Sequence, residues 1–346
     1  MPEIILVDMP LPGGLKVALA LPAVSDDPIV AAYKRGEQPN DYMLRLLCEF
    51  TSPGDAVIDL GCHVGTFCVS AAALGRQVLA VDANRLHIDL VERSRAANGL
   101  QLLKTRFCAV AATEGPVSFN DFGLFGFCTP PSNSKKKGIL KGALEFLRAL
   151  LPARQRSGVE AVSAGPVVPG LPLDRIAREF GAGKVSFLKM DIEGAELDAV
   201  TSGRHFLAAD QPTILFESNP MTASRANSNI RELRSALEAI GYKVFRIEGE
   251  RWIYAPPDQP QPEAWVDMLA LPEAQLPRWK DRIVWIWTPH ELLEKCKAWS
   301  QVPHRNVKEY LLREALPQIS DSRIRKDIRH LKDALKRELA ETSEPH

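Results

Sequence analysis

The stretch that decides the fold is "VIDLGCHVGTFCVSAAALGRQVLAVDA", residues 57–83. It reads as a buried strand, a glycine turn, a helix over 63–75 and a second buried strand that ends on Asp82. A turn of this kind presents backbone N–H groups at a helix N-terminus, beside the carboxyl end of a strand. The stretch therefore predicts a site for a ligand that carries a nucleoside.

Alternating strand and helix patterns continue along the chain. "LLKTRFCAV" (102–110) predicts a third strand, and "VSFLKMD" (185–191) and "PTILFES" (212–218) predict two more. "YKVFRIEG" and "RWIYAPP" (242–257) predict a hairpin at the sheet edge. Strands this apolar need helices on both faces, so we predict a doubly wound α/β domain over 51–275, preceded by a hairpin and helix in 1–50.

Composition narrows the function classes. The 346 residues are 45% hydrophobic and 25% charged with a formal net charge of zero, so no global field attracts nucleic acid, and we expect no nucleic-acid partner. The six cysteines are scattered and form no CxxC pair, which argues against a zinc site and a disulfide framework. The N-terminus lacks the pattern of a secretory signal, and we expect a cytoplasmic protein.

Two segments stand outside the alternation. Residues 123–170 form an insert that contains "KKKGILKGALEFLRALLPARQR" (135–156), a basic helical pattern with leucines on one face. Two uses stay open for this helix: a lid over the active site, or peripheral contact with an anionic membrane. The tail, 276–346, predicts a helical extension whose apolar stripe needs a partner surface: Ile324, Ile328, Leu331, Leu335 and Leu339.

The turn after the first strand favours one nucleoside ligand over another. A dinucleotide fingerprint would place glycines at 61, 63 and 66, whereas this chain has Gly61, His63 and Thr66. A nicotinamide oxidoreductase is therefore the disfavoured alternative. Asp59, Gly61 and Gly65 fit a methionine amino-carboxylate tail, and Asp82 can accept hydrogen bonds from ribose hydroxyls. This arrangement suggests S-adenosylmethionine.

A second motif carries a family resemblance. "FLKMDIEGAELDAVTSG" (187–203), with "DLGCHVG", "LAVDAN" and "LPLDRI", resembles the FkbM-type family of class I S-adenosylmethionine-dependent methyltransferases over about residues 40–275. The resemblance implies a Rossmann-like methyltransferase sheet and methyl transfer to a hydroxyl of a sugar, glycan or secondary metabolite. The chain departs from the family in having aspartate at position 82, alanine at 83 and a longer 123–170. We also place His63, Ala83, Asn84 and Ala109 in the cofactor pocket.

The acceptor chemistry points to carboxylates at strand ends. A sugar hydroxyl is a weak acid, so a base or a metal must assist, and a divalent metal stays open. We expect Asp191 to contact the acceptor and Glu217 to act as base or second anchor. Glu193 is either catalytic or a support of the following helix, and Lys189 is either part of the site or a structural ion-pair partner.

Other readings are weaker. We expect His87 and His205 to be surface or packing residues. "ESNP" (217–220) lacks the aromatic that would stack on a flipped base, which argues against nucleic-acid methylation. A non-catalytic binding module would not need carboxylates at the ends of several strands. The sequence does not determine the acceptor or the oligomeric state.

Overall fold

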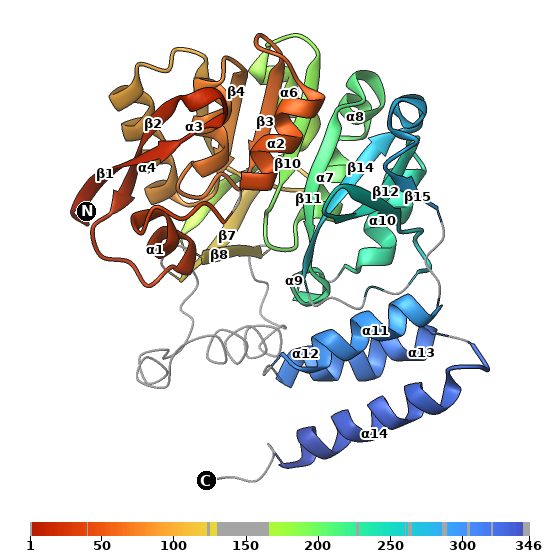
Figure 1. Cartoon of the computed structure of the whole chain (residues 1–346). Helices are drawn as coiled ribbons and strands as arrows, with labels where there is room; N and C mark the ends of the chain where they lie inside the picture. The colour runs from red at the N-terminus through yellow and green to blue at the C-terminus, as the bar shows by residue number, and fades with distance from the viewer. Residues whose placement is uncertain are drawn as a thin grey trace.

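A central sheet with helices on both faces forms the body of the protein (Figure 1). This computed structural model describes residues 2–39, 41–122, 125–129, 166–225, 228–259, 261, 265–285, 289–302, 305–319 and 321–341. The helix predicted in 135–156 lies outside these ranges.

The sheet has the strand order of a doubly wound fold. From one edge to the other its strands are β15 (Ile283–Val284), β13 (Arg251–Tyr254), β12 (Tyr242–Glu248), β14 (Val266–Pro272), β11 (Thr213–Ser218), β10 (Val185–Met190), β3 (Ala56–Leu60), β4 (Gln77–Asp82) and β5 (Leu103–Phe107). The five strands from β11 to β5 are parallel, and β14 runs antiparallel between β11 and β12. The chain moves outward from β3 in one direction and from β10 in the other. A doubly wound sheet binds its ligands at this point of reversal, beyond the carboxyl ends of the strands.

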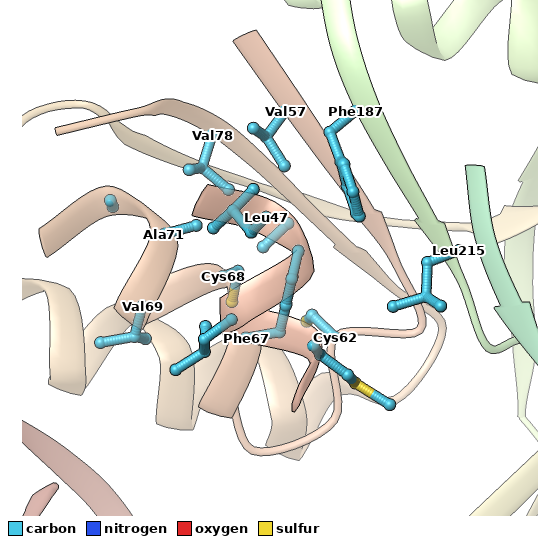
Figure 2. Close-up of a cluster of buried hydrophobic side chains, with 14 of the residues drawn as sticks. Leu47, Val57, Cys62, Phe67, Cys68, Val69, Ala71, Val78, Phe187 and Leu215 are labelled. Atoms are coloured by element: carbon cyan, nitrogen blue, oxygen red, sulfur yellow. The ribbon is translucent and has the colours of Figure 1, made fainter. Parts of the chain in front are cut away.

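Each face of the sheet buries its own apolar cluster. On one face lie α2 (Asp41–Phe50), α3 (Thr66–Ala73), α4 (Arg85–Asn98) and the hairpin of β1 (Ile4–Pro10) and β2 (Lys16–Pro22). On the other lie α6 (Leu173–Phe180), α7 (Glu196–Ser202), α8 (Arg204–Asp210) and α10 (Ile230–Glu238). Val57 packs into the first cluster, beside Leu47 and Phe187 (Figure 2), whereas its neighbour Ile58 packs into the second. Successive side chains of β3 thus point to opposite faces of the sheet, and both faces are buried, as the continuous apolar sequence of this strand predicted.

The segment 102–110 is not the single strand predicted. It divides at Cys108, whose N–H still bonds the Asp82 carbonyl 3.1 Å away. The next two residues, β6 (Ala109–Val110), leave the main sheet and pair with β9 (Val167–Leu171). β9 also pairs with β7 (Gly115–Phe122), which pairs with β8 (Phe125–Thr129) in a small second sheet. The described ends of the predicted insert are therefore strands, because the backbone of β8 pairs with β7 and that of β9 pairs with β6 and β7.

The hairpin of β12 and β13 was predicted at the sheet edge, but it lies one strand inside that edge. β12 and β13 pair antiparallel as expected, but β15 pairs with β13 and forms the edge. The connecting segments are α1 (Pro28–Lys34), α9 (Pro220–Arg225) and the 3₁₀ turns Pro12–Gly14 and Glu273–Trp279.

The C-terminal helices bury the apolar stripe of the last one. They are α11 (Pro289–Ser300), α12 (Arg305–Tyr310), the π-helical turn Leu311–Ala315, α13 (Leu316–Gln318) and α14 (Arg325–Glu341), all in blue in Figure 1. Ile328 and Leu335 of α14 pack with Leu293 and Leu311, so α11–α13 supply the partner surface. Within the described ranges, no helix combines the length and the apolar character needed to cross a membrane.

Candidate active site

A cavity of about 420 Å³ opens at the carboxyl ends of β3, β4, β10 and β11. This volume lies within the range typical of small-molecule sites. Nine of the residues predicted to form the site line it: Gly61, His63, Asp82, Ala83, Ala109, Lys189, Asp191, Glu193 and Glu217. Three others, Asp59, Gly65 and Asn84, are not in its lining and hold the residues around it.

The turn after β3 lies directly against β10. Gly61 has a φ of +76°, and a Cβ atom at this position would lie 1.8 Å from the carbonyl oxygen of Asp191. Only glycine fits this close approach of two backbones. Gly65, with a φ of +91°, is the N-cap of α3. The backbone conformations at positions 61 and 65 explain why the sequence has glycine at both positions of the turn.

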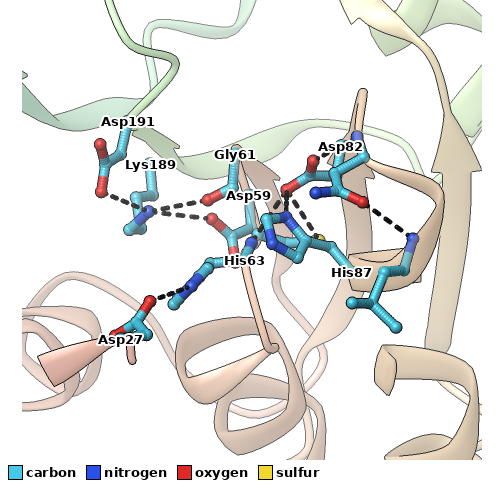
Figure 3. Close-up of polar contacts among 11 residues, drawn as sticks. Asp27, Asp59, Gly61, His63, Asp82, His87, Lys189 and Asp191 are labelled. Carbon is cyan, nitrogen blue, oxygen red and sulfur yellow. Dashed lines mark hydrogen bonds and ion pairs between the residues drawn. The ribbon is translucent and has the colours of Figure 1, made fainter. Parts of the chain in front are cut away.

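Asp82 ends β4 and organises the neighbouring backbone (Figure 3). One carboxylate oxygen accepts the Asn84 N–H at 2.8 Å, and the other accepts the His63 N–H at 3.0 Å. Burial alone would raise the pKa of Asp82, but His87 and these N–H groups outweigh it and lower the pKa. A carboxylate oxygen can accept two hydrogen bonds, so the oxygen that faces Asn84 retains capacity for a ligand hydroxyl. Asn84 itself caps α4 by accepting the Leu86 N–H.

His87 is a packing residue and not a surface residue, the two roles that the sequence left open for it. It is buried, lines the cavity, and its Nδ1 lies 3.0 Å from the Asp82 carboxylate. Its ring also meets the His63 ring edge to face, with centroids 4.9 Å apart. Because α4 begins just after Asp82, the first turn of this helix returns position 87 to the end of β4. His205, in contrast, is exposed as expected and contacts Asp174.

Lys189 joins three oxygens beside the cavity. Its Nζ lies 3.4 Å from the Asp59 carboxylate, 3.4 Å from the Gly61 carbonyl and 3.6 Å from the Asp191 carboxylate (Figure 3). Burial disfavours its charge, but Asp59 and Asp191 outweigh this and raise the pKa of Lys189. Burial also raises the pKa of the fully buried Asp59 to about 6, although Lys189 opposes it. Lys189 therefore holds β3, β10 and the glycine turn together as a cation.

Carboxyl groups gather at the end of the cavity that β10 and β11 form. Asp191 follows β10 with its side chain 43% exposed, and Glu193 adopts a left-handed backbone with a φ of +55°. Burial, followed by the charge of Asp191, raises the pKa of Glu217 well above its ordinary value. This end of the cavity therefore has a carboxyl group whose ionisation its surroundings oppose.

Two acidic residues near this end were not singled out by sequence reasoning. Asp267 lines the cavity and stands directly opposite Glu217 in the antiparallel β11–β14 pair, and it accepts a hydrogen bond from the Tyr42 hydroxyl. The only local signal was the position of Asp267 at the start of the apolar run 268–272. Glu196 was also missed: it lies beneath the loop, accepts the Ile192 N–H at 3.0 Å, and burial raises its pKa to about 8.

A metal was left open by the sequence. In the part of the chain that the structure describes, no three His, Cys, Asp or Glu residues are arranged to hold a metal ion.

The strand order, with β14 antiparallel between β11 and β12, and the cavity at the point of reversal are those of a class I methyltransferase. A family model described as "Methyltransferase FkbM domain" matches residues 59–244, more than half of the chain. The chain belongs to this family, as its motifs predicted.

Individual relatives are more distant. The chain is 29% identical over 133 residues to the 23S rRNA (uracil(1939)-C(5))-methyltransferase RlmD of Acidithiobacillus ferrooxidans, a match that covers 37% of this chain and 28% of that protein. The structure of methyltransferase FkbM from Methylobacillus flagellatus is similar with a TM-score of 0.36 and 13% identity, over 70% of this chain and 52% of that one. A tRNA (uracil-54, C5)-methyltransferase from Pyrococcus abyssi, solved with S-adenosyl-L-homocysteine, has a TM-score of 0.35 and 12% identity, over 77% and 43%. The chain thus spans about a quarter of the curated relative and about half of the first structure.

Proposed function

We propose that this protein transfers a methyl group from S-adenosylmethionine to a hydroxyl of a sugar, glycan or secondary metabolite. One observation supports the proposal: a single cavity is lined by Asp82 and the glycine turn, at the ends of β4 and β3 (the first wall), and by Asp191, Glu217 and Asp267, from the neighbouring β10, β11 and β14 (the second wall). The first wall suits a nucleoside and the second suits an acceptor whose proton must be removed. We assign this reaction to the cytoplasm.

The residues of the first wall fit the donor. Asp82 would accept a ribose hydroxyl through the oxygen that faces Asn84, and His87 holds the other oxygen in place. Ala83 and Ala109 leave room beside Asp82 for a flat base, while Phe119 supplies an apolar surface. S-adenosylmethionine supplies an activated methyl group, so the protein has to align the acceptor and receive its proton.

The acceptor is proposed to be a small molecule or glycan and not nucleic acid. The relative from Acidithiobacillus ferrooxidans is named for uracil C5 methylation, but two observations favour a hydroxyl here. The first is that the net charge of the chain is zero. The second concerns two cysteines that line the cavity: a hydrogen bond with Cys68, followed by burial, raises the pKa of Cys62, and burial raises the pKa of Cys108. A raised pKa weakens both thiols as nucleophiles.

The donor assignment is tested by calorimetry with the Asp82→Ala variant. Loss of a charge-assisted hydrogen bond costs about 1.5–3 kcal/mol, so we expect S-adenosylmethionine affinity to fall at least about tenfold. Asp174→Ala is the matched control, because Asp174 also holds a histidine and a backbone N–H but lies away from the cavity. Wild-type protein that binds NAD and not S-adenosylmethionine would contradict the proposal.

The acceptor class is tested with radiolabelled S-adenosylmethionine. We expect label to enter methyl glycosides or hydroxylated metabolites in a screen, and to stay out of unmodified 23S rRNA and tRNA. Label that enters only the RNA would contradict the assignment of a small-molecule or glycan hydroxyl as acceptor, but it would still show that the protein is a methyltransferase.

A further inference from the structure

We propose that Asp267, held by the Tyr42 hydroxyl and facing Glu217 across the β11–β14 pair, is the base that takes the proton of the acceptor. This inference rests on the proposed methyl transfer and names the residue that completes it. The sequence had pointed to Glu217 as base or second anchor and to Asp191 as the acceptor contact.

The geometry brings Asp267 to the acceptor end of the cavity. β14 runs antiparallel to β11, and the register pairs Asp267 with Glu217. Directly paired residues in antiparallel strands project from the same face, so the two carboxyl groups share one wall. Both line the cavity, and Asp267 is half-buried there.

Tyr42 gives Asp267 a fixed partner. It comes from α2, on one face of the sheet, and its hydroxyl donates to Oδ2 of Asp267. Burial and the charge of Asp267 raise the pKa of Tyr42, so this hydroxyl remains a donor. A carboxylate that accepts from Tyr42 through Oδ2 keeps Oδ1 for another donor, such as an acceptor hydroxyl.

The surrounding charges divide the roles of the two carboxyl groups. Burial raises the pKa of Asp267 to about 6; the Tyr42 bond and Lys189 oppose this, and Asp191 adds to it. The electrostatic contributions that follow burial at Glu217 come from four carboxyl groups, which raise its pKa further: Asp191, Glu193, Glu196 and Asp267. At pH 7 to 8 Asp267 is therefore ionised, whereas burial and these four carboxyl groups hold the pKa of Glu217 well above its ordinary value.

The step balances with these groups alone. The acceptor oxygen forms a bond to the methyl carbon while the bond from that carbon to sulfur breaks. The sulfur keeps the electron pair and leaves as a neutral thioether, and the hydroxyl proton moves to the Asp267 carboxylate. No oxidant, reductant or further reactant is needed.

The main test compares Asp267→Asn and Glu217→Gln in the full-length protein, with radiolabelled S-adenosylmethionine and a panel of methyl glycosides as probes. We expect Asp267→Asn to lower kcat by about 100-fold or more, the usual contribution of a general base, with unchanged S-adenosylmethionine affinity. The activity of the wild type should fall as the pH drops through about 6. The activity of Glu217→Gln should also fall on the acid side, because Asp267 is still present. Wild-type turnover in Asp267→Asn would overturn the inference.

Tyr42→Phe tests the positioning of Asp267. The Tyr42 bond lowers the pKa of Asp267, so its removal should move the acid-side loss of kcat/KM to higher pH. Tyr254→Phe is the matched control, because the Tyr254 hydroxyl also donates to a carboxylate, that of Glu238 at 2.6 Å, and neither residue lines the cavity. An unmoved profile in Tyr42→Phe would contradict the role of Tyr42.

A measurement without an acceptor separates this inference from the proposed function. In protein labelled with ¹³C at the aspartate carboxyl carbons, the resonance that is missing from Asp267→Asn belongs to Asp267. This resonance should titrate near pH 6 in the wild type, and its titration midpoint should move to higher pH in Tyr42→Phe. A resonance that titrates near pH 4 would overturn the inference even if methyl transfer is observed. Wild-type protein that fails to bind S-adenosylmethionine would contradict the proposed function itself.

Discussion

Gly61 is the position where the turn after β3 touches the end of β10. The neighbours of this contact are also unusual, because His63 and Glu193 adopt left-handed backbones with φ of +53° and +55°. Non-glycine residues in this region cost on the order of 1–2 kcal/mol each. Both line the cavity, so strained backbone is concentrated where the ligand is proposed to bind.

The first residue-scale prediction concerns Gly61→Ala. The new Cβ would lie 1.8 Å from a backbone oxygen, so the turn or β10 must move. We expect a loss of unfolding free energy beyond the 1–2 kcal/mol or so of the backbone conformation alone, together with weaker S-adenosylmethionine binding. Urea unfolding and calorimetry measure the two effects.

Gly54→Ala is the control for this prediction. Gly54 also has a positive φ, +96°, but a Cβ there would meet nothing within 4 Å. The Gly54→Ala variant should lose only the unfolding free energy that the backbone conformation costs, and it should bind S-adenosylmethionine with unchanged affinity. Equal effects of the two substitutions would show that the contact with Asp191 has no special role.

At the scale of elements, helix α1 is tied to the glycine turn. Asp27 is its N-cap and accepts the N–H groups of Ile29 at 2.6 Å and Val30 at 3.0 Å. The same carboxylate lies 2.9 Å from Nε2 of His63. Burial opposes ionisation of Asp27, but the hydrogen bond and charge of His63 and the cap N–H groups together lower its pKa. One buried carboxylate thus connects the N-terminal segment to the cavity.

This connection predicts a difference between two helix caps. Asp27→Ala and Asn229→Ala should each lose about 1 kcal/mol of unfolding free energy, because each removes an N-cap. Only Asp27→Ala should also weaken S-adenosylmethionine binding, since Asn229 caps α10 away from the cavity. Equal affinities of the two variants in calorimetry would show that α1 does not support the turn.

At the scale of the whole molecule, several buried carboxyl groups oppose folding at neutral pH. Glu196 is the clearest case, because burial raises its pKa from 4.5 to about 8. A carboxyl group whose pKa is raised by folding binds more protons in the folded state than in the unfolded state between these two values. Its contribution to stability is therefore lost as the pH rises from about 4.5 to about 8.

The corresponding prediction compares Glu196→Gln with the wild type. The difference in unfolding free energy should shift in favour of the variant as pH rises, by at most about 1.4 kcal/mol per pH unit over this window. Chemical unfolding at pH 5 and pH 8 measures it. Glu232→Gln, an exposed substitution on α10, is the control. A constant difference for Glu196→Gln would contradict the raised pKa.

The sequence by itself determined the parallel half of the sheet and nine of the residues that line the cavity. Buried strands and glycine turns are local patterns, and the chain direction determines which residues stand at the carboxyl ends of β3, β4, β10 and β11. Gly61, Asp82, Asp191 and Glu217 could be predicted for this reason, and the family followed from the same motifs.

Only the tertiary structure decided which residues complete the site. Asp267 reaches it because β14 inserts antiparallel between β11 and β12, and Tyr42 reaches it because α2 packs across the sheet. The division of segment 102–110 at Cys108 has the same origin, because β6 pairs with a strand far along the chain. Periodicity reports the burial of a segment but not the partner that buries it. Pairings between distant segments are decided when the whole chain competes for hydrogen bonds and apolar surface.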